Sequence, residues 1–153
     1  MSAPTGVAPA DVSATETWYR MPFEVRDYEV DLQGIVNNAN YFHYFEHARN
    51  VFGRERGFDL SELHEKQGID PVVSRIEVAY RVPLRPRERF SVRVKAYREG
   101  RIRLIFEERL IKDDGTDSAS ARVVVALLKG GRPIPVEDSV AEALEAPEPA
   151  HKG

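Results

Sequence analysis

A carboxylate followed by a glycine turn and a run of asparagines is the part of this sequence best suited to chemistry. Asp31 ends a segment with strand-like alternation, Gly34 follows it in a turn, and Asn38 and Asn40 open a segment with helical periodicity. Asparagine favours a helix start, because its side chain can accept a backbone N–H that has no partner there. Helix starts also favour negative charge. Asp31 could therefore serve as a base or nucleophile toward an acyl group, with N–H donors for the oxyanion, or it could only cap its turn.

The run RDYEVDLQGIVNNANYFHYFEHAR, from Arg26 to Arg49, resembles the signature of hotdog-fold acyl-CoA thioesterases of the 4-hydroxybenzoyl-CoA thioesterase type. That signature has an Asp-x-x-Gly turn, a valine, an Asn–Tyr pair and an acid further along the helix. The matching residues here are Asp31, Gly34, Val36, Asn40, Tyr41 and Glu46. A weaker match continues through residues 78–94, so the resemblance covers most of the chain between Phe23 and Pro135.

The resemblance implies a catalytic role for three of these positions. Asp31 is expected to attack the thioester carbonyl or to activate water for that attack, and the sequence leaves both routes open. Backbone N–H groups at Asn38 and Ala39 are expected to bind the oxyanion. Glu46 is expected near the pocket, or it could simply pair with Arg49 on the helix surface. Relatives often have Tyr or His at the position of Asn38, so the sequence does not predict the acyl group.

The predicted substrate-binding residues lie in the same turn and helix and in a basic loop. They are Gly34, Val36, Ala39, Tyr41, Phe42, Arg85 and Arg87. Tyr41 and Phe42 are expected to line the acyl pocket or to stabilise the loop. Arg85 and Arg87 could meet the phosphates of coenzyme A, because guanidinium groups suit phosphate geometry. A charged turn between two strands is the alternative interpretation of these arginines.

Two histidines four residues apart form an H-x-x-E-H pattern from His43 to His47. They would face one way on a helix and could bind zinc. A catalytic zinc usually needs a third protein ligand, however, and the remaining histidines, His64 and His151, fall in a short predicted helix and in the tail. We therefore predict no metal, and no redox cofactor is implied.

Composition limits the class of protein. A chain of 153 residues predicts one domain with a modest core, and a net charge of −3 does not suggest a nucleic-acid binder. The absence of cysteine excludes a disulfide framework and a thiol nucleophile. No apolar run approaches the roughly twenty residues of a membrane span, and the first residues do not resemble a signal peptide. We expect a cytoplasmic protein with no nucleic-acid partner.

Periodicity predicts one long helix and several antiparallel strands. A strand over residues 18–30, with a bulge near Arg26, precedes a helix over about 40–54 and a short helix over 61–68 that Ser61 caps. Period-two segments then follow from residue 71 to residue 128. Together with the resemblance, this order predicts an α+β hotdog fold, in which an antiparallel sheet of about five strands wraps around one long central helix. The predicted domain spans residues 18–138, between a disordered arm over 1–17 and a tail over 139–153.

We predict an acyl-CoA thioesterase that hydrolyses the thioester of an acyl-CoA or acyl-carrier protein to a free acid. A hotdog hydratase or dehydratase is one alternative, but such enzymes pair an acid with a histidine, and no histidine lies at Asp31. A non-catalytic acyl-CoA or acyl-carrier binding module is the other, although a binder gains nothing from a carboxylate facing a carbonyl. Exposed sheet edges and the resemblance predict a homodimer or homotetramer, with Phe42, Glu46 and Arg49 reaching toward the partner.

Overall fold

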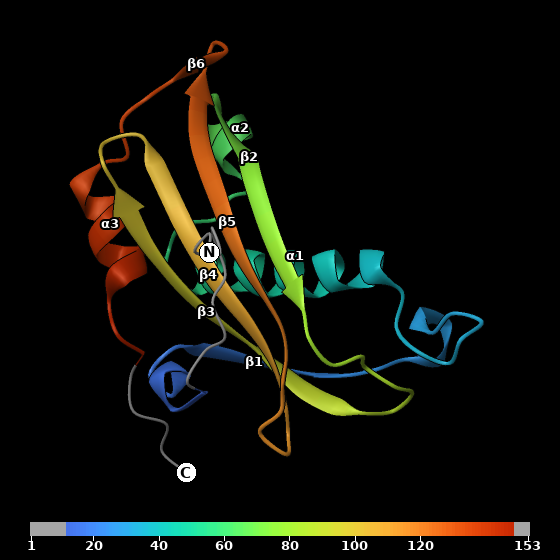
Figure 1. Cartoon of the computed structure of the whole chain (residues 1–153). Coiled ribbons are helices and arrows are strands. Elements are labelled where there is room, and N and C mark those ends of the chain that lie inside the picture. The colour runs from blue at the N-terminus through green and yellow to red at the C-terminus, as the bar shows by residue number, and fades with distance from the viewer. Residues whose placement is uncertain (1–11, 149–153) are drawn as a thin grey trace, which may run out of the picture.

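The computed structural model describes residues 12–148 as one sheet with a long helix on one face (Figure 1). The long helix is α1 (Asn38–Glu55), and the sheet is built from long strands joined by short turns. The remaining elements are η1 (Val12–Thr15), β1 (Tyr19–Glu24), η2 (Asp27–Glu29), α2 (Leu63–Gln67), β2 (Ile69–Tyr80), β3 (Arg89–Glu99), β4 (Arg103–Lys112), β5 (Asp117–Lys129), β6 (Arg132–Pro133) and α3 (Asp138–Glu145).

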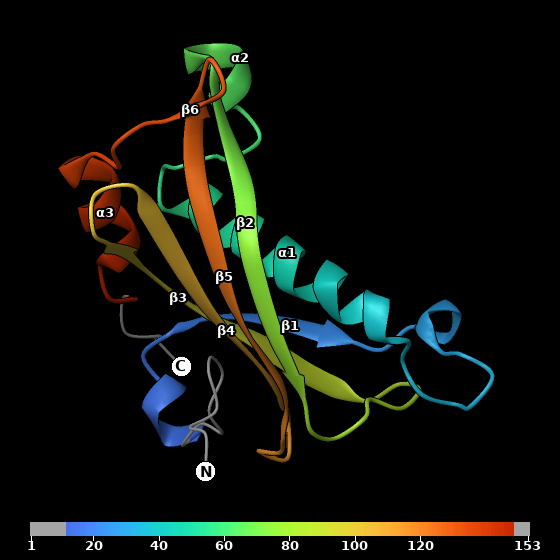
Figure 2. The same ribbon diagram turned by 45° about the horizontal axis from the view of Figure 1, so that its top comes forward.

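The sheet is antiparallel throughout, with the strand order β1-β3-β4-β5-β2 and the short β6 paired to β5. Strands β1 and β2 are therefore its two edges. Helix α1 crosses one face and packs on β3 and β4, while α3 packs against β3 (Figure 2). This arrangement confirms the predicted α+β hotdog fold with about five main strands around a central helix.

Aromatic rings fill the space between α1 and the sheet. Tyr44 and Phe45 of α1 are buried, and Phe23 of β1 stacks on Phe90 of β3 with ring centroids 5.3 Å apart. Phe52 meets Phe106 of β4 edge to face. Each buried ring removes enough apolar surface from water to contribute about 1.5–3 kcal/mol. The rings predicted to form the apolar stripe of the helix thus anchor α1, and with it the start of the helix, to the sheet.

Three local predictions, about the first strand and the starts of α1 and α2, are wrong. The strand expected to continue to Val30 ends at Glu24, and η2 follows, so the change of parity near Arg26 marks the end of a strand and no bulge. The register shift that does occur lies in β2, between Val73 and Arg75. Helix α1 is capped by Asn37 and begins at Asn38, whereas Asn38 and Asn40 were the predicted caps. Ser61 does not cap α2, which begins at Leu63.

The predicted arm and tail lie partly outside the described residues, and their described parts contain helices. Residues 12–15 form η1, whose Thr15 is buried and accepts a hydrogen bond from Arg93. Residues 138–145 form α3, whose Leu144 joins the core. Described elements therefore lie before residue 18 and beyond residue 138, outside the predicted domain limits. No helix within residues 12–148 is long and apolar enough to cross a membrane.

Candidate active site

Asp31 lies in a tight turn that closes on itself. A bridge between Val30 and Val36 brackets the turn, and the Asp31 N–H donates to the Ile35 carbonyl at 2.8 Å. The Asp31 carboxylate accepts the Gln33 N–H through Oδ1 at 2.8 Å. Gly34 has a φ of 79°, a conformation that glycine adopts without steric cost. Asp31 therefore caps its turn with one carboxylate oxygen, while Oδ2 has no hydrogen-bond partner among residues 12–148.

The start of α1 offers one open backbone donor. The Asn37 side chain accepts the Ala39 N–H at 2.9 Å, and the Asn37 carbonyl accepts the Asn40 N–H at 2.9 Å. Of the two predicted oxyanion donors, the Ala39 N–H is thus used by the cap. The Asn38 N–H is the first of the helix and meets no acceptor in the part of the chain that the structure describes.

Val36 and Tyr41 bind the loop between β2 and β3. Both residues are buried, and the Val36 N–H donates to the Leu84 carbonyl at 2.9 Å. The Leu84 N–H in turn donates to the Tyr41 hydroxyl at 3.1 Å. The Tyr41 ring also stands edge-on to Tyr80, with centroids 5.1 Å apart. Both residues therefore join the turn of Asp31 and the start of α1 to this loop.

The acid that pairs with Arg49 is Glu108 of β4, so the alternative in which Glu46 pairs with Arg49 on the helix surface is wrong. Arg49 Nη1 lies 3.0 Å from each carboxylate oxygen of Glu108, and both side chains are buried. Burial raises the pKa of Glu108 to about 7, although Arg49 opposes the shift. Sequence reasoning missed Glu108, but there was a signal for it. It is a lone acid among alternate apolar residues of its strand, Leu104, Phe106 and Leu110.

Only part of the helix flank predicted to reach a partner is accessible. Phe42 is 40% exposed and Glu46 is exposed, whereas Arg49 is buried against the sheet. Arg49 therefore cannot extend from this chain without losing its partner Glu108.

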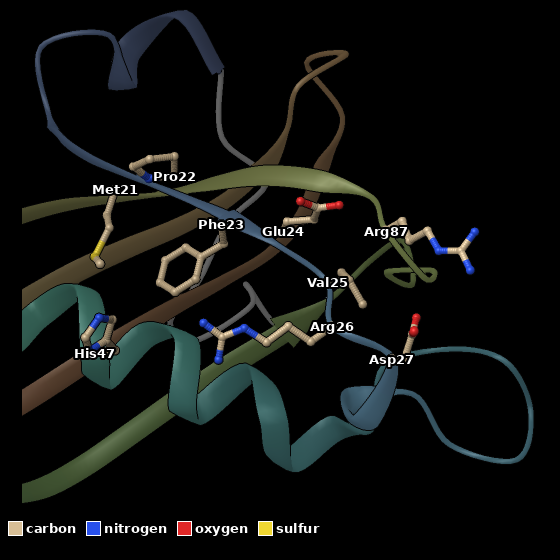
Figure 3. A pocket seen from close by; sticks show the side chains of 9 residues that line it. All are labelled: Met21, Pro22, Phe23, Glu24, Val25, Arg26, Asp27, His47 and Arg87. Atoms are coloured by element: carbon tan, nitrogen blue, oxygen red, sulfur yellow. The ribbon is translucent and has the colours of Figure 1, made fainter.

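Arg85 and Arg87 are exposed in the loop between β2 and β3. Arg87 also lines a groove of about 590 Å³ between β1 and α1, together with Arg26, Asp27 and His47. Figure 3 shows Phe23, Arg26 and His47 gathered between the strand and the helix, with Arg87 and Asp27 at the far end. Asp31, Asn38 and Glu46 do not line this groove. The groove thus brings Arg87 together with Arg26 and Asp27 and does not include the turn that carries Asp31.

His43 and His47 lie beside Glu29 and Tyr44 in a smaller hollow of about 250 Å³ next to this groove. Burial, and then the Glu29 carboxylate, raise the pKa of the Tyr44 hydroxyl. Within residues 12–148, no three histidine or acidic side chains are grouped closely enough to hold a metal ion.

A curved antiparallel sheet around one long helix is the hotdog architecture. Residues 25–144 match the family model described as the thioesterase-like superfamily. The chain therefore belongs to this superfamily, and the protein is a thioester hydrolase.

Named relatives agree with this assignment. The chain is 31% identical to the acyl-CoA thioesterase YbgC of Haemophilus influenzae over 116 residues, which cover 74% of this chain and 85% of the relative. A thioesterase from Thermus thermophilus, solved with coenzyme A and zinc, is 31% identical with a TM-score of 0.71 over 83% of this chain and 97% of that chain. A protein from Aquifex aeolicus, described as hypothetical, is 31% identical with a TM-score of 0.75 over 82% of this chain and 98% of that chain.

Proposed function

We propose that this protein is an acyl-CoA thioesterase that hydrolyses the thioester to a free acid and coenzyme A. One observation carries the proposal: a carboxylate with an uncommitted oxygen and an open helix-start N–H belong to the same short segment, from Asp31 to Asn38. The names of two relatives, an acyl-CoA thioesterase and a thioesterase solved with coenzyme A, support coenzyme A as the thiol carrier.

Asp31 can act in either of two ways. As a nucleophile, its carboxylate oxygen bonds to the thioester carbon, the carbon–sulfur bond breaks, and the thiolate leaves and is protonated by solvent. Water then hydrolyses the resulting anhydride and regenerates Asp31. As a general base, Asp31 takes a proton from a water molecule whose oxygen attacks the same carbon. The carbon–sulfur bond then breaks, and the leaving thiolate takes up a proton from Asp31 or from solvent, which regenerates the carboxylate. In both routes the thioester oxygen becomes negative and the Asn38 N–H stabilises it.

The acyl pocket is proposed to need a second copy of the chain. Asp31, Asn38 and Glu46 line none of the hollows described above, and Phe42 and Glu46 stand exposed on one flank of α1. A partner that covers this flank would complete a pocket and exclude water from it. Gly34, Ala39 and Phe42 are the residues of this chain proposed to border the acyl group there.

A thiol-release assay across short, long and aromatic acyl-CoA substrates tests the function. We expect turnover of at least one substrate, and we expect Asp31→Asn to reduce it by at least about 10²-fold, the usual contribution of a positioned base. Asp27→Asn, which removes a nearby acid outside this turn, is the matched control and should retain activity. Binding of acyl-CoA without any release of thiol would favour a binding module instead.

A further inference from the structure

The loop between β2 and β3, residues 81–88, is fixed by hydrogen bonds and an ion pair to neighbouring strands. Its start is bound to Ser118 of β5, whose carbonyl accepts the N–H groups of Arg81 and Val82. The Lys112 side chain of β4 donates to the Pro83 carbonyl at 3.0 Å and forms an ion pair with Glu88 at 2.7 Å. Such a loop is fixed before any ligand arrives, which reduces the entropy that binding would cost.

The end of the loop pairs with the segment that follows β1. The Val25 N–H donates to the Glu88 carbonyl at 2.9 Å, and the Arg87 N–H donates to the Val25 carbonyl at 3.2 Å. The Arg85 N–H donates to the Glu88 carboxylate at 2.8 Å. The backbone of both arginines is therefore anchored while their side chains point into solvent.

Arg87 has an unusual backbone for an arginine. Its φ of 64° makes it the one non-glycine residue with a positive φ within residues 12–148. This conformation brings Cβ close to the backbone, so glycine or asparagine usually occupies it. Residues held this way cluster at functional sites, where the surrounding structure imposes the strain.

Neither Arg85 nor Arg87 has an acidic partner among the residues that the structure describes. Both guanidinium groups are exposed, and neither forms an ion pair with any residue between 12 and 148. Two other cations at this loop are paired, Lys112 with Glu88 and Arg81 with Asp117. Two unpaired guanidinium groups on a rigid loop suit a doubly charged ligand such as a phosphate.

Leu84 joins this loop to the proposed catalytic turn. It is fully buried, its carbonyl accepts the Val36 N–H, and its own N–H donates to the Tyr41 hydroxyl. Val36 closes the turn of Asp31, and Tyr41 belongs to the first turn of α1. A displacement of the loop would therefore also displace the turn of Asp31 and the start of α1.

We propose that Arg87 is kept in a strained conformation to present its guanidinium, with that of Arg85, to the phosphates of coenzyme A. We further propose that Tyr41 is a positioning residue that acts through Leu84, holding this loop at a fixed distance from Asp31. This inference rests on the proposed function, because it assigns the nucleotide end of the same substrate.

Arg87→Gly tests the strain and the contact together. Glycine removes both the Cβ clash and the charge, so the melting temperature should stay the same or rise by about 2–4 °C. The KM for acyl-CoA should nevertheless rise about tenfold, the equivalent of 1.4 kcal/mol, with kcat little changed. Arg101→Gly, in the turn between β3 and β4, is the matched control; it should lower the melting temperature and leave KM unchanged. A melting temperature lowered equally by both substitutions would refute the strain.

Substrates without the nucleotide distinguish the loss of a phosphate contact from a general loss of activity. The same acyl group on pantetheine lacks the nucleotide phosphates, so Arg87→Gly should leave its turnover unchanged. Tyr41→Phe should raise KM for acyl-CoA about threefold, speed hydrogen exchange at the Leu84 amide and also spare acyl-pantetheine. Equal losses on both substrates would overturn the proposal.

Calorimetry tests phosphate binding by this loop even if the protein hydrolyses no acyl-CoA. Free coenzyme A should bind the wild-type protein at least tenfold more tightly than pantetheine does, and Arg87→Gly should abolish that difference. If no acyl-CoA is hydrolysed but this preference is found, the proposed reaction is wrong and the phosphate site stands. If coenzyme A and pantetheine bind equally well, the phosphate site is refuted.

Discussion

Arg49 Nη1 on α1 is 3.0 Å from both carboxylate oxygens of Glu108 on β4, and this ion pair is buried between the helix and the sheet. The Arg49 guanidinium also lies 6.0 Å from the ring of Phe106, so it is enclosed by apolar neighbours. Buried ion pairs add little net stability, because both charges lose water, but breaking one leaves a buried charge without a partner. The pair therefore restricts where α1 can lie on the sheet more than it stabilises the fold.

Removing one member of this pair should be costlier than removing both. At pH 8, Glu108→Leu and Arg49→Leu should each lower the free energy of unfolding by about 3–5 kcal/mol, because each leaves a buried polar group without its partner, the Arg49 guanidinium in one case and the Glu108 carboxyl in the other. The double variant should lose less than the sum of the two, because no charge remains. Denaturation by urea measures all four proteins. Strictly additive losses would mean that the two side chains do not depend on each other.

Glu108 should also give the stability a specific pH dependence. Its folded pKa of about 7 lies above the ordinary value of 4.5, so the folded state keeps this proton longer than the unfolded state does. The contribution is complete below pH 4.5 and is lost as the pH rises through about 7. Relative to Glu108→Gln, the wild type should lose on the order of 1–3 kcal/mol of unfolding free energy over this interval. Parallel slopes for the two proteins would show that Glu108 does not titrate in this range.

The sequence predicted what depends on local pattern. Period-two alternation located the main strands, and the apolar stripe through Tyr44 and Phe45 located α1. The Arg49–Glu108 pair was not predicted, because its members are 59 residues apart and Glu46 was a nearer acid. The burial of Leu84 was missed for a similar reason, since its partners Val36 and Tyr41 lie on another element. Such contacts depend on which distant segments of the chain pack together, and the periodicity of the sequence does not predict that.

Mutation can show which asparagine caps α1. Asn37 rather than Asn38 accepts the Ala39 N–H, so Asn37→Ala should lower the free energy of unfolding by about 0.5–2 kcal/mol. Asn38→Ala should lower the free energy of unfolding much less, because alanine favours a helix. It also keeps the proposed oxyanion donor, which is the backbone N–H of this residue. Thermal unfolding of the two variants decides between the two caps. A larger loss for Asn38→Ala would restore the cap predicted from the sequence.

Gly53 marks a close contact at the end of α1. A Cβ at this position would lie 2.7 Å from the Phe58 carbonyl oxygen, and the Gly53 carbonyl accepts the Phe58 N–H at 2.8 Å. Gly53→Ala should therefore cost about 1–3 kcal/mol despite the better helix propensity of alanine. Asn50→Ala, on the exposed face of the same helix, is the control and should be neutral or slightly stabilising. Equal stability of the two variants, measured by denaturant titration, would contradict the contact.

The sheet has two edges, and we expect β2 rather than β1 to pair with a second copy of the chain. Both β1 and β2 are edges, but β1 carries Pro22 in its middle, and a proline removes a backbone donor. Along β2, Val72, Val73 and Tyr80 are each at least 40% exposed, which is unusual for large apolar side chains on one strand. Pairing through β2 would cover them and give the exposed edge partners for its N–H and C=O groups.

Charge placed on β2 should therefore separate the copies. Val72→Glu with Val73→Glu is expected to produce monomers, while Ile102→Glu, an equally exposed apolar residue beyond β3, should leave assembly unchanged. Sedimentation over a dilution series measures assembly, and thioesterase activity per chain is measured on the same samples. If the acyl pocket needs both copies, activity should fall in proportion to the monomer fraction. Full activity in a stable monomer would show that one chain contains the whole active site, and that Phe42 and Glu46 do not need a partner.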